Sequence, residues 1–153
     1  MELVLFEPEI PPNTGNVARL CAAAGVPLHL VEPLGFSIDD KHLKRAGLDY
    51  WPHVDVRVWP DMAALEASMA GKRLVCSSSR KGHGGGRFDR FAWRPGDVIV
   101  LGPETRGLPA DLIARHPHCV RIPIRDTVRS LNMSTAAGIL LYTALSATHL
   151  LPE

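Results

Sequence analysis

The chain has 153 residues, of which 46% are hydrophobic and 22% are charged, and its formal net charge is +1. This length suits one domain with a sizeable core, and the composition excludes a disordered chain. The small net charge excludes a uniformly basic nucleic-acid coating protein, and no apolar stretch is long enough to span a bilayer.

The predicted elements alternate between strands and helices. In the first half they are, in chain order, a strand at 3–6, a helix capped by Asn13 or Thr14 and ended by Gly25, a strand at 28–31, a short basic helix from Ser37 and Asp40 to Gly47, and a strand at 54–59. In the second half they are a helix from Asp61 to about residue 70, a strand at 74–77, a polar glycine-rich loop through Gly96, a strand at 98–101, a short helix at 111–115, a strand at 120–124, and a long helix at about 131–149. This order predicts an α/β fold with a mostly parallel sheet and helices on both faces, in one domain over residues 1–153.

Signals for location and metal binding are few. The residues after Met1 include no secretory apolar region, and Cys21, Cys76 and Cys119 form no Cys-x-x-Cys pair. We therefore expect a cytoplasmic protein with reduced thiols. The seven histidines lack zinc-ligand spacing, so no metal site is expected.

Three polar segments follow predicted strands or begin predicted helices. They are Asn13-Thr-Gly-Asn-Val-Ala-Arg19, Leu101-Gly-Pro-Glu-Thr-Arg-Gly-Leu-Pro109 and Arg129-Ser-Leu-Asn-Met-Ser134. Ligands of open α/β sheets collect at the carboxyl ends of the strands, where Glu104 and Arg106 are expected. Gly102 would let a ligand approach the backbone. Taken alone, the polar residues of 129–134 are more typical of helix caps than of ligands.

Familiar nucleotide and hydrolase motifs are missing. The first strand–helix turn has no G-x-G-x-x-G, and the glycine run 82–86 fits neither that pattern nor a phosphate-binding P-loop. His83-Gly-Gly-Gly86 is similar to an esterase oxyanion loop, but the chain has no G-x-S-x-G nucleophile motif. A loop that contacts a large ligand accounts better for these glycines.

Basic residues gather in segments. Residues 72–94 contain seven basic residues and one acidic residue, and two further clusters lie at 41–45 and 121–129. Two interpretations of these clusters remain open: ordinary solvated surface charge, and a surface that binds a polyanion. The final helix contains many small residues, so it could lie in a homodimer interface or pack on its own sheet.

Together, the three segments resemble motifs of the SPOUT-class RNA 2′-O-ribose methyltransferases. The match is closest to the small single-domain branch that modifies the wobble cytidine or uridine of tRNA. Residues 7–12, 39–41 and 45–50 also look like this branch, so the resemblance covers nearly the whole chain. It implies a C-terminal deep trefoil knot, S-adenosylmethionine as the cofactor, and a homodimer in which the partner completes each site.

The resemblance also implies roles for individual residues. The cofactor loops correspond to Ser77 and Ser78 of the serine run 77–79, Gly102, Ile122, Ser130 and Leu131, and which serine of this run contacts the cofactor is open. The candidate catalytic residues are Arg19, with Asn13, Glu104 and Asn132 to orient it, the turn or the ribose. Whether Arg19 accepts the 2′-OH proton or anchors a phosphate is open, because free arginine is effectively always protonated.

An anticodon stem-loop is the RNA that the resemblance implies as partner. The residues expected to bind it are Lys41, Arg45, Arg80, Lys81, Arg106 and Arg129. Two alternatives are an RNA-binding protein that keeps the fold without turnover and a ribose methyltransferase acting on another RNA. The presence of all four candidate catalytic residues argues against a protein that only binds.

Overall fold

The strands form one parallel sheet. The computed structural model describes residues 1–39, 41, 43, 45 and 48–153. The sheet order is β3-β2-β1-β6-β4-β7-β5, with every pair parallel. The strands are β1 (Glu2–Phe6), β2 (Leu28–Val31), β3 (Val56–Trp59), β4 (Leu74–Ser77), β5 (Gly86–Arg87), β6 (Val98–Leu101) and β7 (His118–Arg121). The α-helices whose bounds the structure describes are α1 (Pro11–Ala24), α3 (Met62–Ser68), α4 (Ala110–Arg115) and α5 (Met133–Ala147), and the described 3-10 segments are η1 (Leu48–His53), η2 (Lys81–His83) and η3 (Phe88–Arg90).

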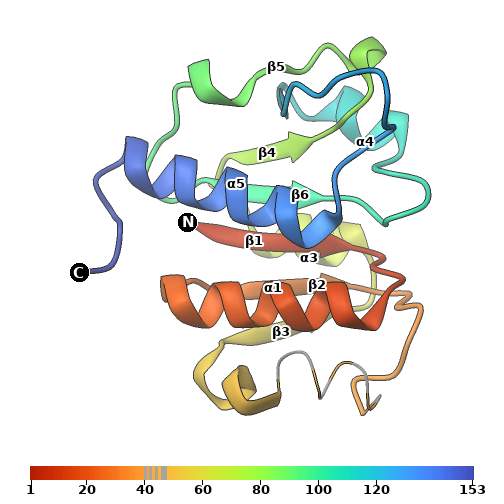
Figure 1. Cartoon of the computed structure of the whole chain (residues 1–153), viewed down its shortest axis with the longest axis vertical. Coiled ribbons are helices and arrows are strands. Elements are labelled where there is room, and N and C mark those ends of the chain that lie inside the picture. The colour runs from red at the N-terminus through yellow and green to blue at the C-terminus, as the bar shows by residue number, and fades with distance from the viewer. Residues whose placement is uncertain (40, 42, 44, 46–47) are drawn as a thin grey trace.

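Helices cover both faces of the sheet, which confirms the predicted α/β layering (Figure 1). Alternate residues of a strand point to opposite faces. Leu3 and Leu5 of β1 therefore pack in the core beneath α1 and α5, whereas Val4 and Phe6 pack in the core beneath α3 and α4. The central strand β6 is buried along its whole length, as its uninterrupted apolar run predicts.

The start of α1 differs from the prediction. The helix begins at Pro11, with Ile10 at the cap position and two prolines in its first turn. Asn13 and Thr14 therefore lie inside the first turn and are buried instead of capping it. Proline suits the first helical positions because it brings no N–H that needs a partner. The predicted end is confirmed, because Gly25 adopts φ 66° after the last helical residue.

Other boundaries shift by a few residues. The last strand covers 118–121 instead of 120–124, because Pro123 cannot donate to a ladder and Cys119 pairs with Cys76 of β4. The third strand begins at Val56, since Val54 closes a turn on Trp51. The loop predicted up to Gly96 contains the two-residue strand β5.

The caps of two later helices are side chains close to the predicted helix starts. Asp61 caps α3 by accepting from the backbone N–H of Ala64 at 2.8 Å, as predicted. The last helix begins at Met133 instead of Leu131, with Asn132 as its cap. Asp40, Lys44 and Gly47 of the predicted basic helix lie outside the described residues.

The strand order places the site. From β1 the chain builds β2 and β3 on one side, and all the later strands on the other. The direction of winding therefore reverses between β1 and its neighbour β6. The loop after β1 and the turn after β6 lie beside each other at this switch point, where open α/β sheets bind their ligands.

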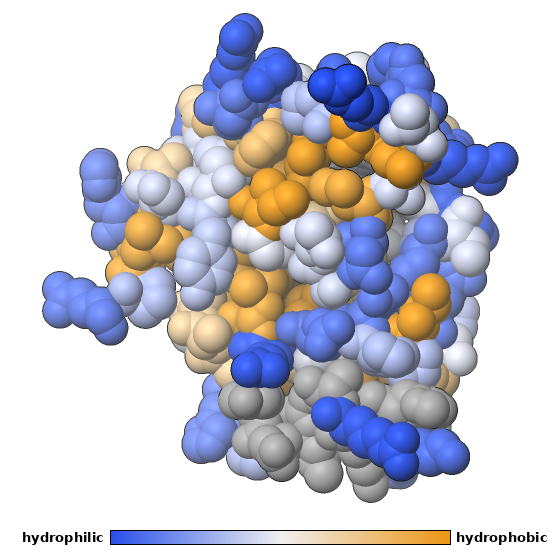
Figure 2. Space-filling view, viewed as in Figure 1, coloured by the Kyte–Doolittle hydropathy of each residue, from blue (hydrophilic) through white to orange (hydrophobic). Residues whose placement is uncertain are grey.

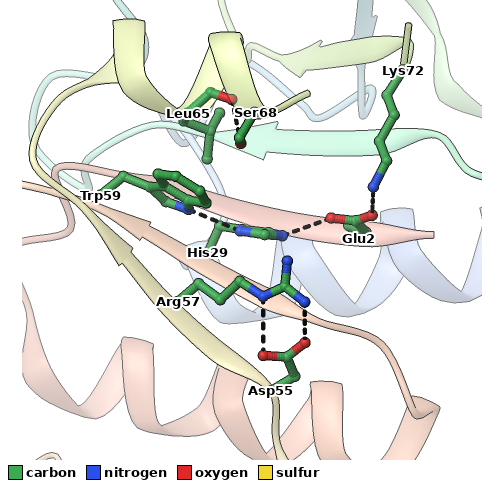
Figure 3. Close-up of polar contacts among 8 residues, drawn as sticks. All are labelled: Glu2, His29, Asp55, Arg57, Trp59, Leu65, Ser68 and Lys72. Atoms are coloured by element: carbon green, nitrogen blue, oxygen red, sulfur yellow. Dashed lines mark hydrogen bonds and ion pairs between the residues drawn. The ribbon is translucent and has the colours of Figure 1, made fainter. Parts of the chain in front are cut away.

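A buried polar network crosses the α3 face of the sheet (Figure 3). Trp59 donates from its indole N–H to Nδ1 of His29 at 3.0 Å, and Nε2 of His29 contacts Glu2 at 2.7 Å. Glu2 also pairs with Lys72. Because Nδ1 of His29 accepts from Trp59, the proton of the neutral ring lies on Nε2 and is donated to Glu2. Burial lowers the pKa of His29, although the bond to Glu2 opposes this shift.

Three further observations concern the thiols, membrane spans and metal ligands. Cys21 and Cys76 are buried free thiols, and burial raises the pKa of each to about 12. No helix in the described part of the chain is long and apolar enough to cross a membrane. Among the described residues, no group of three or more His, Cys, Asp or Glu side chains could hold a metal ion.

Candidate active site

A cleft of about 870 Å³ opens at the carboxyl ends of β4, β6 and β7. Its walls come from residues 77–80, 101–108, 122, 124 and 129–133, together with Ile10, Asn13, His83 and Ala136. This size is within the range of sites for small molecules and cofactors. All six residues expected at the cofactor line this cleft, although their contacts with a cofactor stay predictions.

Three of the four candidate catalytic residues form one hydrogen-bonded chain. Asn132 donates from Nδ2 to Oδ1 of Asn13 at 2.9 Å, and Asn13 donates from Nδ2 to Glu104 at 3.4 Å. Asn132 also caps α5 by accepting from the backbone N–H of Ser134 at 2.9 Å. The chain joins the first turn of α1, the turn after β6 and the start of α5. The side chain of each of the three residues is hydrogen-bonded, and together they fix these three segments relative to one another.

Glu9 and Thr105 add a contact that sequence reasoning missed. Glu104 accepts from the backbone N–H groups of Glu9 (2.8 Å) and Ile10 (3.2 Å). In return, Glu9 accepts from the backbone N–H of Thr105 at 3.0 Å and from its hydroxyl at 2.7 Å. These bonds from Thr105, together with the charge of Arg106, hold the pKa of Glu9 below its usual range. Both residues lie in segments quoted for the resemblance, but no local pattern pairs them.

The structure gives a further reason for glycine at position 102, and the expected approach of a ligand to its backbone stays a prediction. A Cβ at this position would lie 2.3 Å from the backbone nitrogen of Leu108 and 2.5 Å from the carbonyl carbon of Gly107. Real Cβ atoms do not approach backbone atoms so closely, so the glycine lets the turn fold back on itself. The backbone of residues 107 and 108 therefore lies close to Gly102, and this contact shapes the cleft wall.

His83 is a second residue that the sequence did not single out for the cleft. Its Nδ1 atom lies 2.7 Å from the hydroxyl of Ser78, and both residues line the cleft. The Ser78 hydroxyl also accepts from the backbone N–H of Arg80 at 3.2 Å. The contacts of Ser78 therefore tie the start of this loop to η2. The sequence signal for this contact was the position of His83 in the glycine run.

The predicted RNA-binding residues separate into two groups. Arg80, Arg106 and Arg129 line the cleft. Arg106 pairs with Glu7 at 2.8 Å, and its backbone carbonyl accepts from the Arg80 guanidinium at 3.0 Å. The other three are not among the described residues that line the cleft: Lys81 pairs with Asp126 at 3.0 Å, and Lys41 and Arg45 are exposed.

Arg19 is the candidate that the structure separates from the others. It is exposed on α1, six positions after Asn13, and it is not among the described residues that line the cleft. Six residues correspond to about 240° of rotation around a helix at 3.6 residues per turn, so the two residues leave α1 in different directions. Within one chain, the structure brings together Asn13, Glu104 and Asn132 but not Arg19.

Known proteins resemble the chain along nearly its whole length. A protein of Methylovorus glucosotrophus (strain SIP3-4), named tRNA (cytidine(34)-2'-O)-methyltransferase, is 48% identical over 145 residues, which cover 94% of this chain and 92% of the relative. A protein of Escherichia coli (strain K12) with the same name is 42% identical over 146 residues, which cover 94% and 91%. A solved structure described as "Structural insights into the 2-OH methylation of C/U34 on tRNA" superimposes with a TM-score of 0.90 at 46% identity, covering 95% of this chain and 94% of that one. The model of the SpoU rRNA Methylase family matches residues 1–142, and the chain therefore belongs to that family.

Proposed function

We propose that this protein transfers a methyl group from S-adenosylmethionine to the ribose 2′-OH of the wobble cytidine or uridine of tRNA, at position 34. The observation that carries the proposal is the cleft at the switch point, lined by every residue expected to hold the cofactor and by three arginines. Relatives at 42–48% identity with this activity in their names support the substrate. The proposal treats residues 1–153 as a single domain with a knotted C-terminal segment, acting in the cytoplasm.

The residues of the cleft fit the cofactor chemically. Leu101, Ile122 and Leu131 offer apolar contacts for a purine, and the serine run offers hydroxyl groups for polar atoms. The turn after β6 presents backbone groups because Gly102 lets it fold tightly. Bound there, S-adenosylmethionine supplies an electrophilic methyl group on a sulfonium ion.

The protein's own task is then to align the ribose and remove its proton. Asn13, Glu104 and Asn132 hold the starts of α1 and α5 against the turn after β6. The cleft walls at residues 101–108 and 129–133 therefore keep a fixed distance and orientation. Such alignment accounts for a large part of the acceleration of a two-reactant step. Arg19 serves the ribose or its neighbouring phosphate, either by accepting the 2′-OH proton or by anchoring that phosphate.

A homodimer is the arrangement in which Arg19 can act. Arg19 is exposed and lies outside the cleft of its own chain, so a second copy supplies it to the cleft in this proposal. Figure 2 shows apolar side chains gathered on the face that carries α1 and α5, with hydrophilic side chains around the margin. On α5 itself, Tyr142 is exposed beside the half-buried Ile139, so this part of the helix is open to a partner.

The cationic residues provide the salt-sensitive part of RNA binding. Arg80, Arg106 and Arg129 would meet the phosphates next to the target ribose, while Lys41, Arg45 and Lys81 would meet more distant ones. Arg106 and Lys81 are ion-paired here, so an incoming phosphate would have to compete with Glu7 and Asp126. Each phosphate contact that forms adds to the dependence of affinity on salt.

The proposal is tested with methyl-labelled S-adenosylmethionine and tRNA from cells that lack this protein. We expect label in tRNA, no label in ribosomal RNA, and no transfer by the Gly102→Ala variant. Tight tRNA binding without any transfer would support the binding-only alternative and contradict ours. Label in another RNA would contradict the assigned substrate.

A further inference from the structure

Two glutamates exchange hydrogen bonds across the switch point between β1 and β6. Glu104 follows β6 and accepts from the backbone N–H groups of Glu9 and Ile10. Glu9 follows β1 and accepts from both the backbone N–H and the hydroxyl of Thr105. Each carboxylate therefore holds the loop that carries the other. Of the two residues, Glu104 is a candidate catalytic residue, whereas Glu9 has no role assigned so far.

The turn held by Glu9 has other polar contacts at its two sides: Glu104 bonds to the loop after β1, and Arg106 pairs with Glu7 and accepts from Arg80 through its carbonyl. Its own closing bond runs from the backbone N–H of Gly107 to the carbonyl of Pro103 at 2.9 Å. Thr105 and Arg106, at its tip, are exposed and pack into no core. Segments with few buried contacts open locally at low free-energy cost, so the bonds from Glu9 add to these contacts by limiting how far Thr105 can move.

The same turn forms a wall of the cleft. Residues 101–108 line it continuously, and a shift at Thr105 moves the backbone that Gly102 allows to fold close. A wall that is already ordered loses less conformational freedom when a ligand binds.

We infer that Glu9 is a positioning residue for the cofactor, acting through Thr105 to hold residues 102–108 in the conformation that binds it. The inference rests on the proposal that the cleft holds S-adenosylmethionine. Glu9 touches no reacting atom in this account. Its removal should weaken cofactor binding without slowing methyl transfer once the cofactor is bound.

The test measures the Kd of S-adenosylhomocysteine by calorimetry on the full chain. We expect Glu9→Ala to raise this Kd about tenfold, the scale of a lost hydrogen bond to a charged group. Thr105→Val should raise it severalfold, and the double variant should bind no more weakly than Glu9→Ala, because both changes remove one interaction. Glu9→Gln keeps an acceptor oxygen at the same reach and should restore most of the affinity.

A matched control separates positioning from a general loss of stability. Glu32 is an exposed glutamate after β2, at the same edge of the sheet, and its side chain bonds to no other residue in the described part of the chain. Glu32→Ala should leave the Kd unchanged. With tRNA, Glu9→Ala should raise the KM for the cofactor while kcat at saturating cofactor and the KM for tRNA stay within about twofold.

The outcomes are distinct. A Kd for Glu9→Ala within about twofold of the wild-type value would overturn the inference, as would multiplicative effects in the double variant. A uniform fall in kcat and in both affinities, together with a lower Tm, would also overturn it in favour of a structural role. Wild-type protein that binds S-adenosylhomocysteine but methylates no tRNA would contradict the proposed function and leave the role of Glu9 standing.

Discussion

Asn132 donates a hydrogen bond from Nδ2 to Oδ1 of Asn13 at 2.9 Å, across 119 residues of chain. Asn132 uses its other polar atom, Oδ1, to cap α5 by accepting from the backbone N–H groups of Ser134 and Thr135. One side chain therefore ends one helix and ties it to another. Because the bond to Glu104 continues from Asn13, the geometry of the cleft depends on both functions.

Substituting Asn132 separates these two functions. Asn132→Ala loses the cap and the bond to Asn13, and it should lower the free energy of unfolding by about 1–2 kcal/mol and reduce kcat. Asn132→Asp keeps the capping oxygen but loses the Nδ2 donor, so it should retain most of the stability while kcat still falls. Urea unfolding and single-turnover transfer measure the two effects. Equal kcat values for Asn132→Asp and the wild type would show that the bond to Asn13 has no part in the reaction.

Arg19→Ala should lower the rate of methyl transfer by a factor of about 10² or more. The Kd of S-adenosylhomocysteine should stay nearly unchanged. The reason is that Arg19 lies outside the cleft of its own chain, whereas the predicted cofactor residues line it. Loss of cofactor binding in this variant would contradict the division of roles between α1 and the cleft.

Mixed dimers test where Arg19 acts. An Arg19→Ala chain has an intact cleft, and a Gly102→Ala chain has an intact Arg19. A purified dimer of the two should recover about half of the wild-type activity if Arg19 serves the partner's cleft, because one of its two symmetric sites is complete. A mixed dimer as inactive as either parent would show that Arg19 acts within its own chain or not at all.

The sheet could be predicted from the sequence because its central strands are short apolar runs that end at polar residues. The run 98–101 is fully buried, and the following turn lines the cleft. The predicted start of α1 was wrong because the backbone N–H of Ile10, the residue before the helix, bonds to Glu104, which is 94 residues away. β5 was missed because its two residues are exposed and carry no apolar pattern.

The site was predictable in its composition but not in its internal contacts. Local patterns and the family resemblance identified Asn13, Glu104 and Asn132, yet nothing local shows that they bond to one another. The Glu9–Thr105 contact joins residues 96 positions apart, and the position of Arg19 outside the cleft depends on how α1 is rotated on the sheet. Tertiary packing decides both features.

Gly102→Ala should destabilise the turn after β6 and weaken cofactor binding. The new Cβ would meet backbone atoms of Gly107 and Leu108, which cannot move without opening the turn, and overpacking of this kind costs about 1–3 kcal/mol. Gly82→Ala is the matched control, since a Cβ there meets nothing within 4 Å. Thermal unfolding and calorimetry check both variants, and similar results for the two would refute the steric role of Gly102.

The stability of the protein should fall as the pH drops from 7 to about 5.5. Burial lowers the pKa of His29 in the folded state from 6.5, so below that pH the unfolded chain binds the extra proton and unfolding becomes easier. The slope cannot exceed about 1.4 kcal/mol per pH unit for one proton. The lowered pKa of Glu2 acts in the same direction but only below its ordinary value of 4.5.

A pair of variants isolates this effect. His29→Gln removes the titrating ring and should flatten the slope between pH 7 and 5.5, whatever its effect on stability at neutral pH. His53→Gln, which alters an exposed histidine, should keep the wild-type slope. Urea unfolding at several pH values supplies the measurement, and a wild-type slope in His29→Gln would assign the pH dependence to another group.

The most direct measurement maps the methylated nucleotide. The protein is incubated with S-adenosylmethionine and tRNA from cells that lack it, and nuclease fragments of the tRNA are analysed by mass spectrometry. We predict one added methyl group on the ribose of position 34, and none when that nucleotide carries a 2′-deoxyribose. A methyl group at another position, or on a base, would contradict the assignment of this protein as a wobble-ribose methyltransferase.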